Sequence, residues 1–155
     1  MHMQLTLRPA TMEDARRLFE WRNDPLTRQN SRNTKEGVWE DHVAWLEKSL
    51  ISPTRKLYIA EENGTPVGTV RSDDDTDGYT ELSYTTAPEA RGQGYGKRMV
   101  VQFVEEQLKD KKLKAEIKKG GNEGSESIAH ALGLRPTEER PSEDPEDPRP
   151  LVMWK

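Results

Sequence analysis

The stretch from Pro88 to Met99, Pro-Glu-Ala-Arg-Gly-Gln-Gly-Tyr-Gly-Lys-Arg-Met, decides the fold of this chain of 155 residues. Its three glycines alternate with other residues, between a segment that predicts a strand (79–86) and one with apolar residues at helical spacing (99–108). Glycines let backbone N–H groups turn toward one point, and a helix start adds unpaired donors and the positive end of its dipole. Such a turn favours a phosphate ligand.

The spacing of the glycines excludes two common nucleotide sites. A dinucleotide-binding G-x-G-x-x-G motif would need its third glycine at Lys97, and a P-loop needs four residues between its glycines. The pattern that fits is R-x-x-G-x-G, formed by Arg91, Gly94 and Gly96. It resembles the pyrophosphate loop of the GNAT (Gcn5-related) acetyltransferases. A turn without a ligand is the weaker interpretation, because each glycine lowers helix or strand stability by roughly 0.5–1 kcal/mol.

The rest of the chain predicts the elements of the same fold in the same order. Alternating apolar residues predict strands at 4–8, 56–62, 66–72, 79–86, 113–117, 135–139 and 151–154. Helical spacing predicts helices at about 12–24, 39–50, 95–110 and 125–132. The expected fold class is therefore α/β (α+β): one domain over 1–155, with a mixed, mostly antiparallel sheet of about six to seven strands, flanked by about four helices. The resemblance to the GNAT family implies that the sheet is splayed at the cofactor cleft. The polar stretch 27–36 predicts a loop, and the Pro- and acid-rich stretch 140–149 predicts a mobile one.

Composition narrows the class of protein further. The net charge of −4 argues against a general nucleic-acid binder, and the absence of cysteine excludes a cysteine acyl-enzyme. No apolar run approaches the roughly 18 residues of a membrane span, and no signal-peptide core is present. We therefore expect a cytoplasmic protein without a nucleic-acid or membrane partner.

The resemblance to the GNAT family implies where acetyl-CoA, the acyl donor, would bind. Backbone groups of the strand before the loop would pair with the pantetheine arm, and the loop itself would hold the pyrophosphate. A later N-x-x-S pattern would lie along the arm, and Gly133-Leu134 follows it where the family has Gly-Phe. The implied cofactor-binding residues are Tyr84, Thr85, Thr86, Arg91, Gly92, Gln93, Gly94, Tyr95, Gly96, Lys97, Arg98, Asn122 and Ser125.

Two residues on the strand before the loop are the candidates for catalysis. Glu81 is the expected general base, acting through a water molecule, and Ser83 shares its strand face. An exposed strand carboxylate without a role is the alternative for Glu81. The place of the tyrosine that many GNAT enzymes use as a general acid falls on Ala129, so the sequence leaves the acid unassigned.

Several other residues have two interpretations each. His42 and Trp39 are expected in the core, whereas Trp45 would line the acceptor cleft or a subunit contact. Arg22, with two nearby asparagines, falls where GNAT acceptor loops lie, or has an ordinary capping role. The D-x-D-x-D-G stretch at 73–78 is interpreted as a solvated turn rather than a metal site, because the twelfth position lacks glutamate and strands flank it.

The function expected is therefore transfer of an acetyl group from acetyl-CoA directly to a primary amine. Trp21-Arg22-Asn23, with residues near 42–46, resembles the branch of ribosomal-protein N-terminal and nucleotide-sugar amine acetyltransferases. The acceptor would be a protein N-terminus, an amino sugar or another small amine, and the protein a monomer or homodimer. A non-catalytic sensor or scaffold that binds acyl-CoA is the alternative function.

Overall fold

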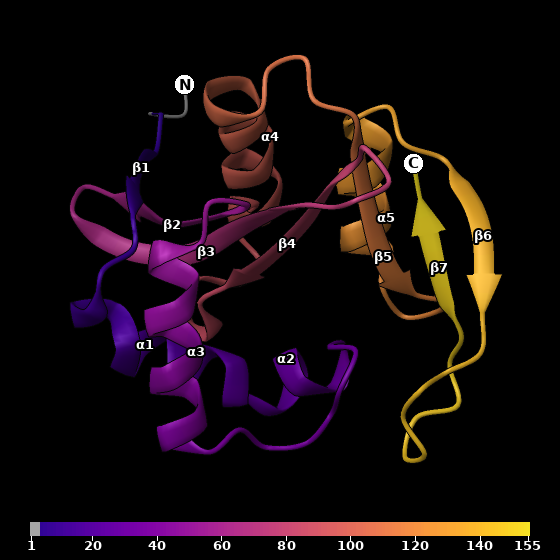
Figure 1. Cartoon of the computed structure of the whole chain (residues 1–155), viewed down its shortest axis with the longest axis horizontal. Coiled ribbons are helices and arrows are strands. Elements are labelled where there is room, and N and C mark those ends of the chain that lie inside the picture. Colours follow the sequence, from indigo (N-terminus) through magenta and orange to yellow (C-terminus); the bar gives the residue numbers. More distant parts are fainter. Residues whose placement is uncertain (1–3) are drawn as a thin grey trace.

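The structure is a computed structural model, and it describes residues 4–155. A seven-stranded sheet carries helices on both faces (Figure 1). The elements are β1 (Thr6–Pro9), α1 (Ala15–Asn23), α2 (Pro25–Gln29), α3 (Trp39–Ile51), β2 (Arg55–Glu62), β3 (Thr65–Asp74), β4 (Thr80–Thr86), α4 (Tyr95–Gln107), β5 (Leu113–Lys118), α5 (Glu123–Ala131), β6 (Pro136–Arg140) and β7 (Leu151–Trp154). This arrangement confirms the expected fold class, with one helix more than expected.

The sheet has the strand order β1-β2-β3-β4-β5-β7-β6. Every neighbouring pair is antiparallel except β4 and β5, which run parallel. These two strands pair only at Thr80 with Leu113 and at Glu81 with Lys114, and beyond those residues they diverge (Figure 1). The sheet is therefore split along its centre, as the resemblance implied.

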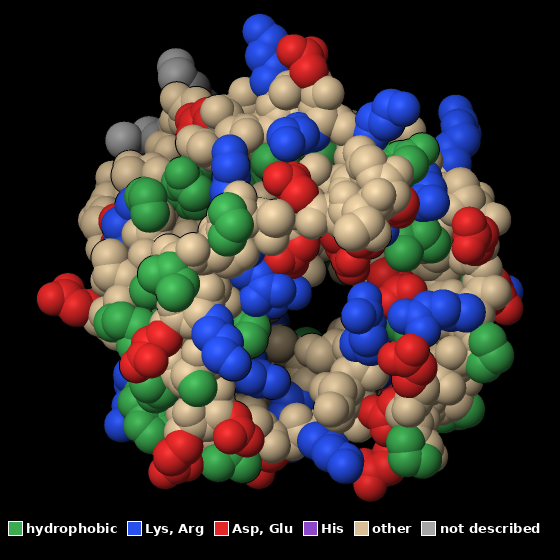
Figure 2. Space-filling model, in the orientation of Figure 1, with side chains coloured by type: hydrophobic (Ala, Val, Ile, Leu, Met, Phe, Trp, Pro, Cys, Tyr) green, Lys and Arg blue, Asp and Glu red, His purple; other side chains and the backbone are tan. Residues whose placement is uncertain are grey.

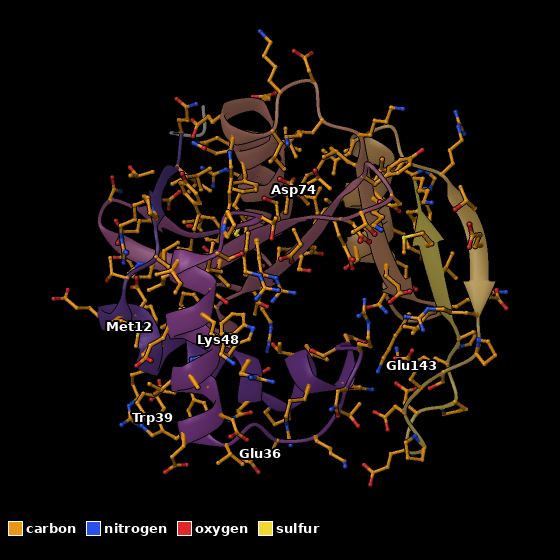
Figure 3. The ribbon with its side chains drawn as sticks, viewed as in Figure 1. Met12, Glu36, Trp39, Lys48, Asp74 and Glu143 are labelled. Carbon is orange, nitrogen blue, oxygen red and sulfur yellow. The ribbon has the colours of Figure 1, made fainter. Side chains whose placement is uncertain are left out.

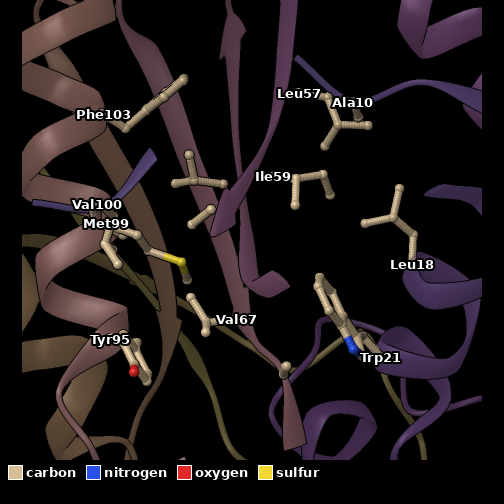
Figure 4. Close-up of a cluster of buried hydrophobic side chains, with 14 of the residues drawn as sticks. Ala10, Leu18, Trp21, Leu57, Ile59, Val67, Tyr95, Met99, Val100 and Phe103 are labelled. Carbon is tan, nitrogen blue, oxygen red and sulfur yellow. The ribbon is translucent and has the colours of Figure 1, made fainter. Parts of the chain in front are cut away.

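Apolar side chains on both faces of the sheet form the main core. Met99 and Phe103 of α4 are fully buried on one face, and Leu18 and Trp21 of α1 are buried on the other (Figure 4). Gly68 of β3 allows α4 to approach closely, because a Cβ built there would lie 2.7 Å from both the Met99 sulfur and the Thr85 carbonyl oxygen. The position of α4, and of the glycine turn before it, is thus fixed by packing.

Local signals in the sequence account for most element ends. The Asn63-Gly64 turn joins β2 and β3 with φ angles of 51° and 81°, as a tight hairpin requires. The Thr11 hydroxyl and the Asp14 carboxylate form a capping box before α1. Gly133 follows α5 at φ 80°, in the expected position after a helix.

One expected loop begins as a helix. The stretch 27–36 was predicted to be a loop throughout, but α2 spans Pro25–Gln29. Pro25 occupies the first turn, where its missing N–H costs nothing, and the Asp24 carboxylate accepts from the Thr27 amide. The proline that ends α1 therefore also starts α2.

The acid-rich stretch after β6 is attached to the end of α2 and to the segment that follows it. The Asp144 carboxylate accepts from the Thr34 amide at 3.0 Å, and the Arg149 Nη2 donates to the Gln29 carbonyl at 2.6 Å. Lys118 of β5 is buried and donates to both the Asp147 carboxylate and the Gln29 carbonyl. The contacts of Thr34 and Gln29 with this stretch span 110 and 120 residues of sequence. The mobility of 140–149 stays a prediction.

Among residues 4–155, each helix is too short or too polar to cross a lipid bilayer. The D-x-D-x-D-G stretch ends β3 and forms the turn before β4. There Lys114 donates to the carboxylates of Asp75 and Asp77, at 2.5 and 2.8 Å. A lysine ammonium thus satisfies two of the carboxylates that resembled a metal site.

Candidate active site

A cleft of about 1060 Å³ opens where β4 and β5 diverge, and it continues toward α1 and α3. The space-filling view shows a hollow in the middle of this face, with basic and acidic side chains around it (Figure 2). Eight of the predicted site residues line the cleft. They are Glu81, Ser83, Tyr84, Thr85, Thr86, Arg91, Asn122 and Ser125.

Strand β4 offers unpaired backbone groups to this cleft. The Ala87 amide donates to the Val67 carbonyl on β3, and the Thr80 amide donates to the Lys112 carbonyl on the opposite side. Because hydrogen bonds alternate sides along a strand, Tyr84 and Thr86 direct their N–H and C=O groups toward β5, which has already diverged. The backbone of Thr85 faces β3 instead, so two of the three predicted residues offer strand-pairing groups.

The glycine turn has the geometry of an anion site. Gly92 and Gly94 adopt φ angles of 79° and 78°, and Gly94 is the residue before the first turn of α4. Within residues 4–155, the N–H groups of residues 92–97 have no backbone acceptor, while the Arg98 amide already donates to the Gly94 carbonyl. Unpaired amides at a helix start, beside two left-handed glycines, are suited to a pyrophosphate.

The side chains of the turn point in several directions. The Arg91 guanidinium donates to the Asp24 carboxylate and, at 2.9 Å, to the Thr27 hydroxyl, so it attaches the turn to α2. The Tyr95 hydroxyl donates to Glu62 at 2.5 Å, and Arg98 contacts the same carboxylate at 3.3 Å. Gln93 and Lys97 are exposed. The turn therefore offers a ligand its backbone more than these side chains.

Helix α5 borders the other side of the cleft. The Tyr84 hydroxyl lies 2.7 Å from the Ser125 hydroxyl and so links β4 to α5, while burial raises the pKa of Tyr84. Asn122 is buried at the start of α5 and donates to the Lys118 carbonyl. Ala129 is also buried in the cleft wall, so this part of α5 carries no acid at the family's usual place.

Glu81 and Ser83 lie on the face of β4 opposite α4. Glu81 is not alone there, because Arg32, from the segment between α2 and α3, donates to its carboxylate at 3.3 Å. Arg32 also lies 2.7 Å from Glu116 of β5, which Arg140 contacts from the other side. Burial alone would raise the pKa of Glu116, but these two guanidinium groups hold it below its usual value.

Sequence reasoning missed the charged residues on β2 and β3 that face this cleft. Arg71 lies opposite Ser83, and its Nη2 approaches the Ser83 hydroxyl at 3.4 Å. Arg71 and Arg55 bind the same carboxylate, that of Asp73, at 3.0 and 2.6 Å. The available signal was the alternation of side chains along a strand. It places Arg71 on the same face as Thr69, and Arg55 on the same face as Leu57. Trp45 lines the cleft, and its contact with an acceptor stays a prediction.

A split central sheet, a strand with unpaired backbone groups and a glycine turn before a helix together define an acyl-CoA-dependent acyltransferase. The sequence matches the family described as "Acetyltransferase (GNAT) domain" over residues 4–135, and the chain belongs to this family. It is therefore an acetyl-CoA-dependent acetyltransferase, which confirms the expected family and reaction. A search of curated proteins finds no match.

Solved structures show the same fold at low sequence identity. The ribosomal-protein-alanine N-acetyltransferase of Brucella melitensis is 24% identical, with 97% of this chain and 98% of that chain covered and a TM-score of 0.80. The spermidine N-acetyltransferase of Vibrio cholerae, in complex with CoA and spermine, is 14% identical, with 97% and 94% covered and a TM-score of 0.81. An N-acetyltransferase of Staphylococcus aureus is 20% identical, with 98% and 97% covered and a TM-score of 0.78.

Proposed function

We propose that this chain transfers the acetyl group of acetyl-CoA directly to a primary amine, bound in the part of the cleft that faces α1 and α3. The observation that carries the proposal is the junction of the open edge of β4 with the glycine turn. A peptide-like arm and a pyrophosphate are the two parts of CoA that such a junction accommodates. The spermidine enzyme and the ribosomal-protein enzyme among the structural relatives support an amine acceptor.

The residues have distinct proposed roles. Backbone amides of residues 92–97 hold the pyrophosphate, and the backbone of Tyr84 and Thr86 pairs with the arm. An N–H group of β4 polarises the thioester carbonyl as negative charge develops on its oxygen. Asn122 and Ser125 line the arm from α5.

Glu81 is proposed to accept the proton that the amine loses, through a water molecule. The nitrogen forms its bond to the acetyl carbon as the carbon–sulfur bond breaks, and the proton lost by nitrogen is matched by one taken up by the departing thiolate or by solvent. The Arg32 guanidinium, 3.3 Å from the Glu81 carboxylate, holds it in place. Because the chain has no cysteine, no acyl-enzyme through a thiol is needed or available.

The substitution Gly94→Glu tests the site. A side chain at φ 78°, with a negative charge where the phosphates would lie, should weaken CoA binding by more than tenfold in calorimetry. The matched control is Gly64→Glu, which imposes the same backbone strain at φ 81°, also in open space, but in the β2–β3 turn. Equal CoA affinity in both variants would contradict the site.

Turnover separates the enzyme from its alternative, a protein that senses or scaffolds acyl-CoA. Release of CoA is measured with a panel of primary amines and acetyl-CoA. Turnover of at least one amine, lost together with CoA affinity in Gly94→Glu, is the expected result. Tight CoA binding without turnover of any amine would favour the sensor, for which Ala129 at the usual acid position is the supporting observation.

A further inference from the structure

The floor of the acceptor part of the cleft holds a cluster of cationic side chains on β2 and β3. Arg55 and Arg71 lie beside each other, and both guanidinium groups lie over the indole ring of Trp45, at 5.6 and 5.7 Å from its centre. Their shared counter-ion is Asp73. We call Arg55 and Arg71 the arginine pair. Figure 3 shows the side chains that the sheet and the helices direct toward the cleft.

The charge of the arginine pair is not balanced. One carboxylate serves two guanidinium groups, whose side chains are only 25% and 31% exposed. Burial lowers the pKa of Arg71, and the like charge of Arg55 lowers it further, whereas the carboxylate of Asp73 raises it. Within residues 4–155, the Nη1 atom of Arg71 has no hydrogen-bond partner.

Other charges near the cleft do not remove this surplus. Glu81 faces Arg71 but its carboxylate is already engaged by Arg32. Arg22 lines the same cleft and, among the described residues, forms no ion pair. Asp74 and Asp75, at and just beyond the end of β3, also line the cleft, but they pair with Lys111 and Lys114.

A partly buried cation without a full counter-charge is costly unless a ligand supplies the missing anion. The arginine pair is part of the cleft in which the acceptor is proposed to bind, and Arg71 is the strand neighbour of Ser83, so an anion on it would lie near the reacting amine. Guanidinium groups bind carboxylate and phosphate oxygens in paired hydrogen bonds. A purely cationic acceptor such as a polyamine would meet like charge here.

We propose that the arginine pair recognises an anionic group of the acceptor, so that the substrate is an amine that also carries a carboxylate or a phosphate. This inference rests on the proposed function and names the substrate class for that same cleft. Arg71 is the residue that contacts the anion, and Trp45 with Asp73 holds the arginine pair in place. The acidic net charge of the whole chain does not describe this local site.

The test uses amines in matched pairs, each differing in one anionic group. Glucosamine 6-phosphate is compared with glucosamine, and alanine with alaninamide, by the ratio of kcat/KM at saturating acetyl-CoA. We expect at least a tenfold preference for the anionic member of one pair, and the pair that shows it distinguishes phosphate from carboxylate. In Arg71→Gln the preference should fall to near one through KM, with the KM for acetyl-CoA unchanged.

The control is Arg16→Gln, which removes a guanidinium that also lies over a tryptophan, at 4.8 Å from the Trp39 ring, but outside the cleft. Calorimetric titration of the CoA complex with the same four compounds needs no turnover. If no amine is acetylated, the proposed function fails, and the titration still tests the anion site. The inference would be overturned if glucosamine and alaninamide bound as tightly as their anionic partners or more tightly. It would also be overturned if Arg71→Gln kept the preference for the anionic amine.

Discussion

The guanidinium of Arg91, in the glycine turn, donates to the carboxylate of Asp24, which caps α2. The two residues lie 67 positions apart, and Thr27 joins the same contact through its hydroxyl. The Arg91 hydrogen bond is the main reason that the pKa of Asp24 lies below its usual value. The turn proposed to hold the donor is thereby attached to a helix that lines the same cleft.

We predict that Asp24→Ala weakens both ends of this link. Loss of a helix cap lowers stability by about 1 kcal/mol, which is roughly 3 °C in Tm for a chain of this size. The released Arg91 should also loosen the turn and raise the KM for acetyl-CoA several-fold. Thermal denaturation and steady-state kinetics measure the two effects.

The control is Asp41→Ala, which removes an exposed carboxylate from the first turn of α3. It should change Tm by less than 1 °C or so and leave the KM for acetyl-CoA unchanged. An Asp24→Ala variant with normal KM would show that the turn keeps its shape without α2.

Glu81→Gln should lower kcat by about 10²-fold if Glu81 serves as the base. The affinity for CoA should stay the same, because the side chain lies on the strand face that carries Ser83 and not at the turn. The acidic limb of the pH–rate profile should also be lost, since glutamine cannot titrate. Rates are measured from pH 5 to 9 with one saturating amine.

For comparison, Glu138→Gln alters an exposed carboxylate on the edge strand β6. This change should leave the profile intact. If Glu81→Gln retained both the wild-type rate and the wild-type profile, Glu81 would have no part in proton transfer.

His42 should make the fold sensitive to mild acid. Its side chain is 1% exposed and stacks near Trp45, and its Nε2–H donates to the Ala15 carbonyl at 3.0 Å. Burial lowers the pKa of His42, so below about pH 6.5 the unfolded chain binds a proton that the folded chain does not. Stability should therefore be complete above that pH and should fall as the pH drops toward the folded-state pKa.

The comparison is between Tm at pH 7.5 and at pH 5.5, for the wild type and for His42→Phe. Phenylalanine keeps the aromatic stack but cannot bind a proton, so its Tm should change less between the two pH values. Identical pH dependence in the two proteins would assign the acid sensitivity to other groups.

Two glycine-to-alanine substitutions should have opposite effects on stability. In Gly68→Ala the new methyl group would lie 2.7 Å from the Thr85 carbonyl oxygen, which belongs to the backbone and cannot turn aside. Crowding of this kind lowers stability by roughly 1–3 kcal/mol. Gly124→Ala, on α5 with no atom within 4 Å of the new carbon, should instead raise it by about 0.5–1 kcal/mol. Chemical denaturation of both variants measures the difference, and a stable Gly68→Ala protein would show that α4 can shift outward.

The parts of the fold that the sequence predicts are those set by local chemistry. The glycine turn, the Asn63-Gly64 hairpin and the capping box of Thr11 depend on residues next to one another, and all three are in place. The start of α2 was missed because the polar stretch 27–36 was interpreted as a loop, whereas the helix starts at Pro25 and depends on the Asp24 cap.

The acceptor side of the cleft was harder to predict because its charges pair over long distances. Arg32 and Glu81 are 49 residues apart, and nothing in the sequence around either indicates the other. Arg71 lies in a strand whose neighbours are apolar or small, where a charged residue is most simply interpreted as exposed. Its orientation is decided by Trp45, on α3, and by Asp73, further along β3.

The contacts of Thr34 with Asp144 and of Gln29 with Arg149 have a kinetic consequence. They join α2 and the segment after it to the stretch before β7, beside a single cleft that contains both the donor site proposed at the open edge of β4 and the acceptor site proposed near α3. Both substrates can be bound at the same time. Initial-rate plots at varied concentrations of both should therefore give intersecting lines, the pattern of a ternary complex, and parallel lines would point to an acetylated form of the protein instead.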